Sequence, residues 1–176
     1  MGDPNFDRSV VLLASHDEEG AFGWVINGAP VLSIRELLEQ AGFQSPVSDE
    51  PSLSGSVLRG GPVSTEQVWL VYPAEKQLDD VAGQIEITPG IYATASRDFL
   101  TKIQQGLVVP GLRAFAGYAG WAGGQLEGEI QLGGWLPGAV ESHLIFETEP
   151  KDIWQQAYQL QGTNPFSFTS RTVGSA

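Results

Sequence analysis

The chain has 176 residues, no cysteine, and a formal net charge of −12 from 21 acidic and nine basic residues. This length fits one domain with its own core, and the lack of thiols excludes disulfides, thiolate metal sites and a cysteine nucleophile. The acidic balance weighs against direct binding to DNA or RNA, because clustered Lys and Arg provide most of the affinity for phosphates.

The first third of the chain predicts a β-hairpin, a helix and a loop. Residues 9–15 and 21–27 are apolar and flank a short polar turn, which is typical of a hairpin. Ser33 and Glu36 have the spacing of a capping box, and apolar residues then recur at helical spacing up to Gly42. Residues 44–55 are polar, contain two prolines and predict a surface loop.

The remaining segments alternate between strands and helices. We expect a strand at residues 68–72, entered through the Gly60-Gly61-Pro62 turn, a hairpin at 85–94 and a helix capped by Ser96 at 96–106. A strand at 113–118, a helix at 124–132, a short strand at 143–146 and a final helix at 150–160 follow. Paired strands with helices between them favour an α+β fold. We expect one domain over residues 1–162 and a polar C-terminal tail over residues 163–176.

Motifs of known catalytic sites are missing from the sequence. It contains no GxSxG, HExxH or P-loop pattern. His16 and His143 are more simply solvated or hydrogen-bonded side chains than metal ligands or bases. Glu127 and Glu129 are two residues apart on a predicted helix, so they point to different faces and form no catalytic pair. We therefore expect no catalytic residue, no metal and no cofactor, and no stretch is apolar enough to predict a membrane span.

The most unusual segment is RAFAGYAGWAGGQLEGEIQLGGWL, residues 113–136, in which seven glycines surround one tyrosine and two tryptophans. Bare backbone beside large rings predicts either close packing of the chain on itself or contact with a ligand. Asn27, Tyr118 and Gln125 are polar groups within apolar stretches, and buried polar groups need partners. They could satisfy each other, or line a cleft with Trp121 that holds a small polar ligand or a peptide.

Several ordered motifs resemble the YqgE/AlgH family of bacterial proteins: DPNFDRSVVLL, GAFGWVIN, RGGPV, ITPGIYATASRDFL and GYAGWAGGQLEGEIQLGGWL. The resemblance covers nearly the whole chain. It implies an α+β fold of two closely packed β-rich lobes, with antiparallel and mixed sheets and peripheral helices, in a cytoplasmic protein. The family carries the label of transcriptional regulator, with no established reaction.

Two departures from the family pattern have consequences. Members usually place a basic residue before a proline after VIN, where this chain has Gly28 and Ala29, so that positive charge is missing here. Members also usually have an apolar strand before the DPNF motif, and we expect this first family strand to be missing. Its loss would leave a sheet edge unpaired, and we expect self-association through that edge.

The family motifs define a candidate surface for a ligand or partner, made of Asn27, Gly60, Gly61, Pro62, Tyr118, Trp121, Gln125 and Glu127. The competing interpretation is that these glycines and aromatics serve backbone packing alone. Our leading hypothesis is a non-enzymatic regulatory or binding protein that contacts an unidentified protein partner rather than DNA. The alternative is a small-molecule sensor or an enzyme with a polar cleft around Asn27, Tyr118, Gln125 and Glu127.

Overall fold

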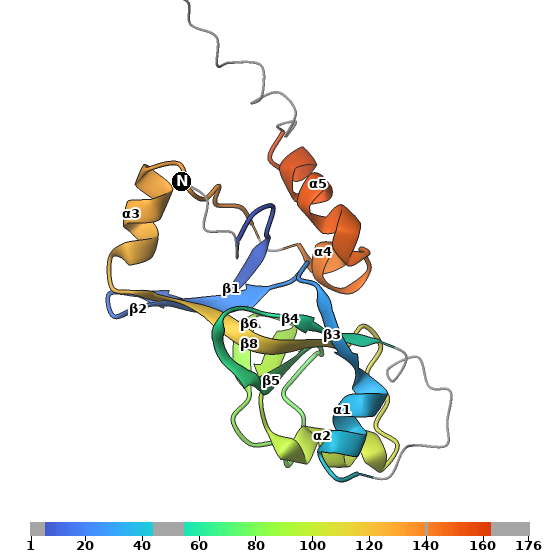
Figure 1. Ribbon diagram of the computed structural model, residues 1–176. Coiled ribbons are helices and arrows are strands. Elements are labelled where there is room, and N and C mark those ends of the chain that lie inside the picture. The colour runs from blue at the N-terminus through green and yellow to red at the C-terminus, as the bar shows by residue number, and fades with distance from the viewer. Residues whose placement is uncertain (1–5, 44–54, 140, 163–176) are drawn as a thin grey trace, which may run out of the picture.

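The computed structural model describes residues 6–43, 55–139 and 141–162 (Figure 1). The described residues form eight strands: β1 (Val11–Asp17), β2 (Gly20–Val25), β3 (Pro30–Ser33), β4 (Ser56–Arg59), β5 (Val63–Pro73), β6 (Ile85–Thr88), β7 (Ile91–Thr94) and β8 (Arg113–Ala122). They also form five helices: α1 (Ile34–Gln40), α2 (Arg97–Gln104), α3 (Gln125–Gln131), α4 (Ser142–Phe146) and α5 (Pro150–Leu160).

The strands form one sheet that curls into a nearly closed barrel. The strand order is β1-β2-β8-β5-β7-β6, and the end strands β1 and β6 lie against each other. Strand β4 pairs with β8 in parallel and carries β3 on its other side, whereas the other pairs are antiparallel. A mostly antiparallel sheet with helices around it confirms the predicted α+β class.

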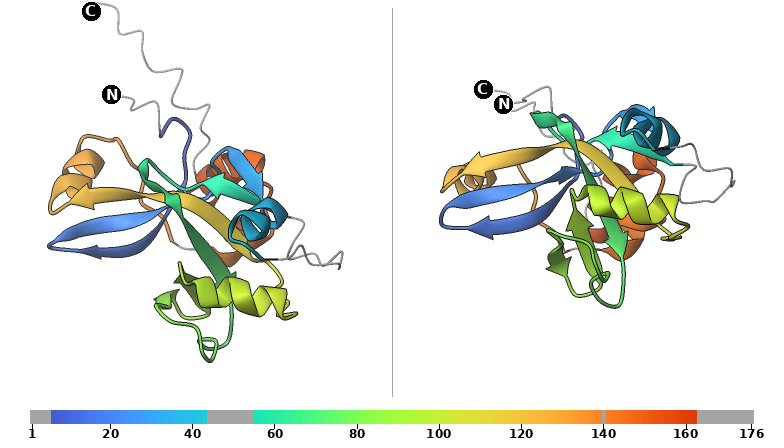
Figure 2. Two further views of the ribbon diagram at one scale, coloured as in Figure 1. Left: turned by 60° about the horizontal axis from the view of Figure 1, so that its bottom comes forward. Right: turned by 90° about the horizontal axis from the view of Figure 1, so that it is seen from below.

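Strand β8 belongs to both parts of the sheet. Its C-terminal half pairs with β2, and its N-terminal half lies between β4 and β5. Figure 2 shows β8 crossing the molecule, with α3 at one end and α1 and α2 near the other. The glycine-rich segment singled out in the sequence is therefore the strand that holds the fold together.

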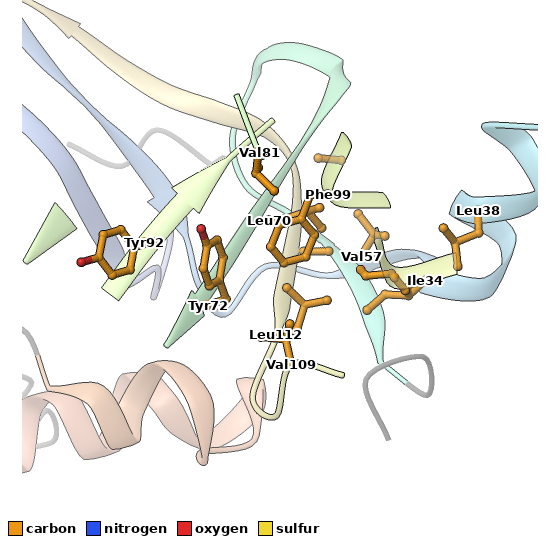
Figure 3. Packing of buried hydrophobic residues seen from close by; sticks show 13 residues of the cluster. Ile34, Leu38, Val57, Leu70, Tyr72, Val81, Tyr92, Phe99, Val109 and Leu112 are labelled. Carbon is orange, nitrogen blue, oxygen red and sulfur yellow. The ribbon is translucent and has the colours of Figure 1, made fainter. Parts of the chain in front are cut away.

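Three clusters of buried side chains form the core. The first packs α1 and α2 against β4 and β5, with Ile34, Leu38 and Phe99 at most 1% exposed (Figure 3). The second fills the barrel between β1, β2, β5, β7 and β8, and Ile145 and Ile153 of α4 and α5 pack against it. The third lies between α3 and the outer face of β2 and β8. Full burial of a large aliphatic or aromatic side chain contributes about 1.5–3 kcal/mol, so these clusters dominate stability.

The predicted helix starts are confirmed in atomic detail. The Ser33 hydroxyl accepts a hydrogen bond from the Glu36 amide, and the Glu36 carboxylate accepts one from the Ser33 amide. Hydrogen bonds from the Ser33 backbone and then from its side chain lower the pKa of Glu36. Ser96 caps α2 in the same way by accepting from the Asp98 amide.

The predicted strand at residues 143–146 is wrong, because this segment is the short helix α4. Apolar runs of four or five residues suit a buried strand and a buried helical turn equally well. Here the turn is fixed from outside: the Arg113 guanidinium donates hydrogen bonds to the carbonyl oxygens of Ile145, Phe146 and Thr148. These acceptors are available because a helix leaves its last carbonyl groups unpaired.

Two strands, β3 and β4, were not predicted. Each has only four residues, and their sequences PVLS and SVLR lack a clear alternation of apolar and polar residues. The predicted loop at residues 44–55, apart from Gly55, and the predicted tail at residues 163–176 lie outside the described residues.

Candidate functional site

The turn at Gly60 and Gly61 is the point where three strands meet. The Gly60 carbonyl oxygen accepts a hydrogen bond from the Val25 amide at 2.8 Å, and the Gly60 amide donates to the Ala116 carbonyl oxygen at 2.8 Å. One residue thus connects the end of β2 to the middle of β8. The Gly60-Gly61 turn and the glycine-rich segment of β8, both singled out in the sequence, are therefore in direct contact.

Neither glycine leaves space for a side chain. A Cβ atom on Gly61 would lie 2.1 Å from the carbonyl carbon of Tyr118, and one on Gly60 would lie 2.5 Å from the carbonyl oxygen of Gly117. Real Cβ atoms essentially never come so close to backbone. Gly117 has a φ of +70°, and a Cβ atom on it would lie 2.7 Å from the Gly61 carbonyl oxygen and 2.8 Å from that of Val63. These glycines therefore act through close backbone packing.

Beside this junction lies a shallow hollow, which we call the aromatic hollow. It is open to solvent, has a volume of about 290 Å³ and is lined by Phe22, Gln67, Trp69 and Tyr118. The three rings are half-buried, and Gln67 is exposed. Pockets for drug-sized ligands run from roughly 300 to 1,000 Å³, so this volume suits a single side chain or a similar small group.

Two irregularities in the sheet create the hollow. Between the pairs Val63 with Tyr118 and Val68 with Ala116, strand β5 has four residues where β8 has only Gly117. The positive φ of Gly117 also changes the alternation of β8, so that Phe115 and Tyr118 join the same cluster although they are three residues apart. A regular strand would send residues three apart to opposite faces.

The rings around the hollow form a continuous aromatic group. The Phe22 ring centroid lies 6.0 Å from the ring centroids of both Trp69 and Tyr118, and the Phe22 and Tyr118 planes meet at 80°. Trp24 lies beneath, 5.7 Å from Phe22 and 5.2 Å from Trp69. Tilted and edge-to-face contacts at these distances are favourable and hold the rings in place.

Two polar atoms in this group have no partner. The indole nitrogens of Trp24 and Trp69 are buried without a hydrogen bond to any described residue. A buried donor without a partner costs about 1–3 kcal/mol. This cost makes the aromatic hollow the least satisfied part of the described core.

A second aromatic group lies near the C-terminal end of β8, under α3, and its indole nitrogens both have hydrogen-bond partners. We call it the Glu129 clamp. The Glu129 carboxylate accepts hydrogen bonds from the indole nitrogens of Trp121 at 3.0 Å and Trp135 at 2.7 Å, and from the Gln125 amide at 3.0 Å. Burial raises the pKa of Glu129, but these three hydrogen bonds outweigh it and leave that pKa below its usual value.

Similarity to known proteins identifies the family of this chain. A family model described as AlgH-like matches residues 1–166. The chain belongs to the AlgH-like family. UPF0301 proteins from Idiomarina loihiensis and Photobacterium profundum are 35% and 36% identical, over 92% and 94% of this chain and 85% and 88% of theirs.

Solved structures of AlgH-like proteins have the same fold. The solution structure of the AlgH protein from Pseudomonas aeruginosa gives a TM-score of 0.74 at 29% identity, covering all of this chain and 90% of that one. A crystal structure of a protein from Corynebacterium diphtheriae gives a TM-score of 0.70 at 24% identity, covering 90% of this chain and 80% of that one. These comparisons support the family and the fold, including the resemblance inferred from the motifs.

The polar residues predicted to share a cleft in this AlgH-like chain have separate partners. The Asn27 amide accepts from the Val10 amide and donates to the Arg8 carbonyl oxygen, both at 2.8 Å. The Gln125 side chain bonds to Glu129 and to the Ala122 amide. Asn27 and Gln125 therefore fix backbone segments in different parts of the sheet.

Glu127 makes a surface contact instead. Its carboxylate lies 2.7 Å from the Nε2 atom of His16, and the two side chains are 45% and 40% exposed. Hydrogen bonds from its own backbone and from His16 lower the pKa of Glu127. The interpretation of His16 as a hydrogen-bonded histidine is confirmed, and Glu127 and Glu129 indeed have different neighbours.

Of the eight candidate site residues, only Tyr118 lines the aromatic hollow. Gly60 and Gly61 pack against the backbone of β8 and exposed Pro62 follows them, whereas Trp121 and Gln125 belong to the Glu129 clamp. Sequence analysis missed Phe22, Gln67 and Trp69. The available signal was the spacing of Phe22 and Trp24, which puts two rings on one face of a strand.

No cluster of three or more His, Asp and Glu side chains within residues 6–43, 55–139 and 141–162 is arranged to hold a metal ion. Among the helices in those ranges, none has the length and hydrophobicity needed to cross a membrane.

Proposed function

We propose that this AlgH-like protein is a non-enzymatic regulatory protein of the bacterial cytoplasm, which binds a segment of a partner protein at the aromatic hollow. The observation that carries this proposal is the hollow itself: three half-buried rings and an exposed amide, held on a rigid sheet and open to solvent. Aromatic side chains in such positions dominate the energy of many protein interfaces.

The chemistry of the lining supports binding rather than catalysis. The lining contains no carboxylate, amine or imidazole, and the hollow has room for about one side chain. An acid–base mechanism would need a group with a suitable pKa within hydrogen-bonding reach of the substrate. The acidic chain also makes direct recognition of DNA an unfavourable alternative.

The hypothesis of a sensor or enzyme with one polar cleft has less support. Asn27, Gln125 and Glu127 direct their side chains to internal partners in different places, and Tyr118 alone faces the hollow. Self-association through a sheet edge stays a prediction. Strands β1, β3 and β6 are the places to test it, because each pairs with one neighbour among the described strands.

Site-specific photo-crosslinking in living bacteria tests the proposed function. A benzophenone amino acid replaces Gln67 in the hollow or, as a matched control, exposed Gln155 on α5. We expect one discrete protein adduct from position 67, lost in the Trp69→Ala background, and none from position 155. The same adducts from both positions, or no adduct from position 67, would overturn the proposal.

A binding assay with duplex DNA provides the second arm of this test. Because the chain is strongly acidic, we expect no complex with duplex DNA at physiological salt. A complex whose affinity falls steeply with added salt would show that DNA, not a protein, is the partner.

A further inference from the structure

We propose that the aromatic hollow receives the guanidinium group of an arginine on a basic segment of the partner protein. This inference rests on the proposed function above and specifies the chemistry that the hollow recognises. Three independent features of the molecule support it: the faces of the rings, the distribution of charge along the chain, and the way the protein uses its own arginines.

The rings that line the hollow lie at different angles to one another. Phe22 and Tyr118 stand nearly perpendicular, at 80°, and Trp69 is tilted by 44° to Phe22. The face of an aromatic ring carries negative potential and attracts a cation within about 6 Å of its centroid, most strongly for tryptophan. A group that enters between these walls would meet more than one face.

The strands that line the hollow, β2, β5 and β8, carry one arginine and no lysine. That arginine is Arg113 at the start of β8, and its guanidinium is bound to the carbonyl oxygens of Ile145, Phe146 and Thr148. None of the nine basic residues of the chain lies in residues 9–34, 60–75 or 114–150, which contain all four lining residues. Acidic residues are present in all three segments, including Asp17, Glu18 and Glu19 at the β1–β2 hairpin and Glu66 in β5. The net negative charge of these segments favours the approach of a cation over that of an anion.

Arg59, which precedes the Gly60-Gly61 turn, points away from the hollow. Arg59 ends β4, next to Leu58, which packs in the same cluster as the hollow. Successive side chains of a strand point to opposite faces, so Arg59 lies on the face of Val57 and not of Leu58. Val57 belongs to the cluster under α1 and α2.

The protein pairs its own arginines with aromatic faces in two other places. The Arg8 guanidinium lies 5.4 Å from the ring centroid of Trp154, and that of Arg97 lies 5.0 Å from that of Phe43. Neither pair uses a ring of the hollow. Arginine fits such faces better than lysine, because its guanidinium is planar and weakly hydrated. The Gln67 amide oxygen lies in the same lining and can accept one of its N–H groups.

The test uses the peptide acetyl-Gly-Arg-Gly-amide and its citrulline analogue, which has the same shape without the charge. Binding to the intact, ¹⁵N-labelled protein is followed through the indole N–H signals of its five tryptophans. We expect the arginine peptide to shift the signals of Trp69 and Trp24 and to bind at least fivefold more tightly than the citrulline peptide. We also expect added NaCl to weaken the binding, because exposed charges are screened.

Three variants localise the binding. Gln67→Lys places a cation at the hollow without touching the core, and Trp69→Leu removes the strongest ring; each should weaken the arginine peptide at least fivefold. Trp154→Leu is the control, because the Trp154 face already pairs with Arg8, and it should leave the affinity unchanged. Unchanged affinity in Gln67→Lys would overturn the proposal even if Trp69→Leu fails to fold.

The outcomes separate this inference from the proposed function. Equal binding of the two peptides, with the crosslink from position 67 intact, overturns the arginine but leaves a protein partner. Tighter binding of tetramethylammonium than of the arginine peptide overturns the arginine in favour of a small quaternary ammonium ligand. Preference for arginine without any crosslink supports the cation site and contradicts the protein contact.

Discussion

The two aromatic groups on β8 use similar side chains with opposite results. In the Glu129 clamp, one carboxylate accepts hydrogen bonds from both Trp121 and Trp135, and α3 covers the outer face of the strand. At the aromatic hollow, the indole nitrogens of Trp69 in the lining and of Trp24 beneath it are buried without any described partner, and the three lining rings stay half-buried and open to solvent.

This difference separates stability from recognition. The clamp satisfies every polar atom that its indoles bury, as expected for a group that fastens a helix to a sheet. The hollow and the Trp24 ring beneath it keep two indole donors without a described partner, which lowers stability. The lining rings also stay accessible to a binding partner. Binding sites are often less stable than the rest of the fold, because their side chains are arranged for a ligand rather than for internal contacts.

The largest expected loss of stability comes from a change that disturbs β8, which carries residues of both aromatic groups. Gly61→Ala places a Cβ atom within 2.4 Å of three backbone atoms of Tyr118 and Ala119, so β8 must move. We expect a loss of about 3 kcal/mol in the free energy of unfolding, measured by urea denaturation. In Gly128→Ala, where nothing lies within 4 Å, we expect a gain of about 0.5–1 kcal/mol because alanine favours a helix. Equal stability of the two variants would contradict the close packing described above.

The next largest effect acts on the clamp alone. Glu129→Gln keeps the shape of the side chain but removes its charge and replaces one carboxylate oxygen with a donor. Both indoles donate to the same oxygen, Oε2, and Gln125 donates to Oε1, so the new NH₂ group leaves at least one of these donors without an acceptor and the remaining hydrogen bonds lose their charge. We expect a loss of about 2 kcal/mol in urea denaturation and a shift of the Trp121 and Trp135 indole signals. Glu127→Gln, on the exposed pair with His16, should lose far less. A similar loss in both variants would show that the clamp is no stronger than a surface contact.

A matched pair of substitutions measures the comparison directly. Trp121→Phe removes an indole N–H bonded to a carboxylate, whereas Trp69→Phe removes one without a described partner. Both changes remove similar ring area, so we expect Trp121→Phe to be less stable than Trp69→Phe by about 1 kcal/mol or more. If Trp69→Phe proves the less stable of the two, the distinction between the regions fails.

The smallest expected effect is a dependence on pH. The pKa of Glu129 is lower in the folded protein than its ordinary value of 4.5. The unfolded chain therefore takes up its proton first, and the stabilisation by the Glu129 charge is present above pH 4.5 and is lost as the pH falls through the lower, folded pKa. The difference in stability between the wild type and Glu129→Gln should shrink from pH 6 to pH 3. A constant difference would indicate that the hydrogen bonds do not depend on the charge.

Local chemistry explains what the sequence could predict. The capping box of Ser33 and Glu36, the strand at β8 and the helix at α5 all follow from residues close together in the chain, and the structure contains them. Motif order was enough to place the chain in its family. The short segment α4 was mispredicted because its conformation depends on Arg113, some 30 residues away in the chain, whose hydrogen bonds no local pattern contains.

The candidate site was harder to predict for the same reason. Asn27 and Gln125 were correctly recognised as polar groups that need partners, but the partners come from other segments of the folded chain. The hollow needs the mismatch between β5 and β8 near Gly117, which brings Gln67 and Trp69 beside Phe22 and Tyr118. Such pairing irregularities become visible only when the register of the strands is known.

The shared position of β8 also has a consequence during synthesis. Strand β8 is made roughly 90 residues after β2, and β2, β4 and β5 all pair with it. At about 5–20 residues per second, the β1–β2 hairpin leaves the ribosome at least several seconds before its neighbour in the barrel exists. Until then an apolar strand edge stays open, so nascent chains of this protein should depend on chaperones more than its small size suggests.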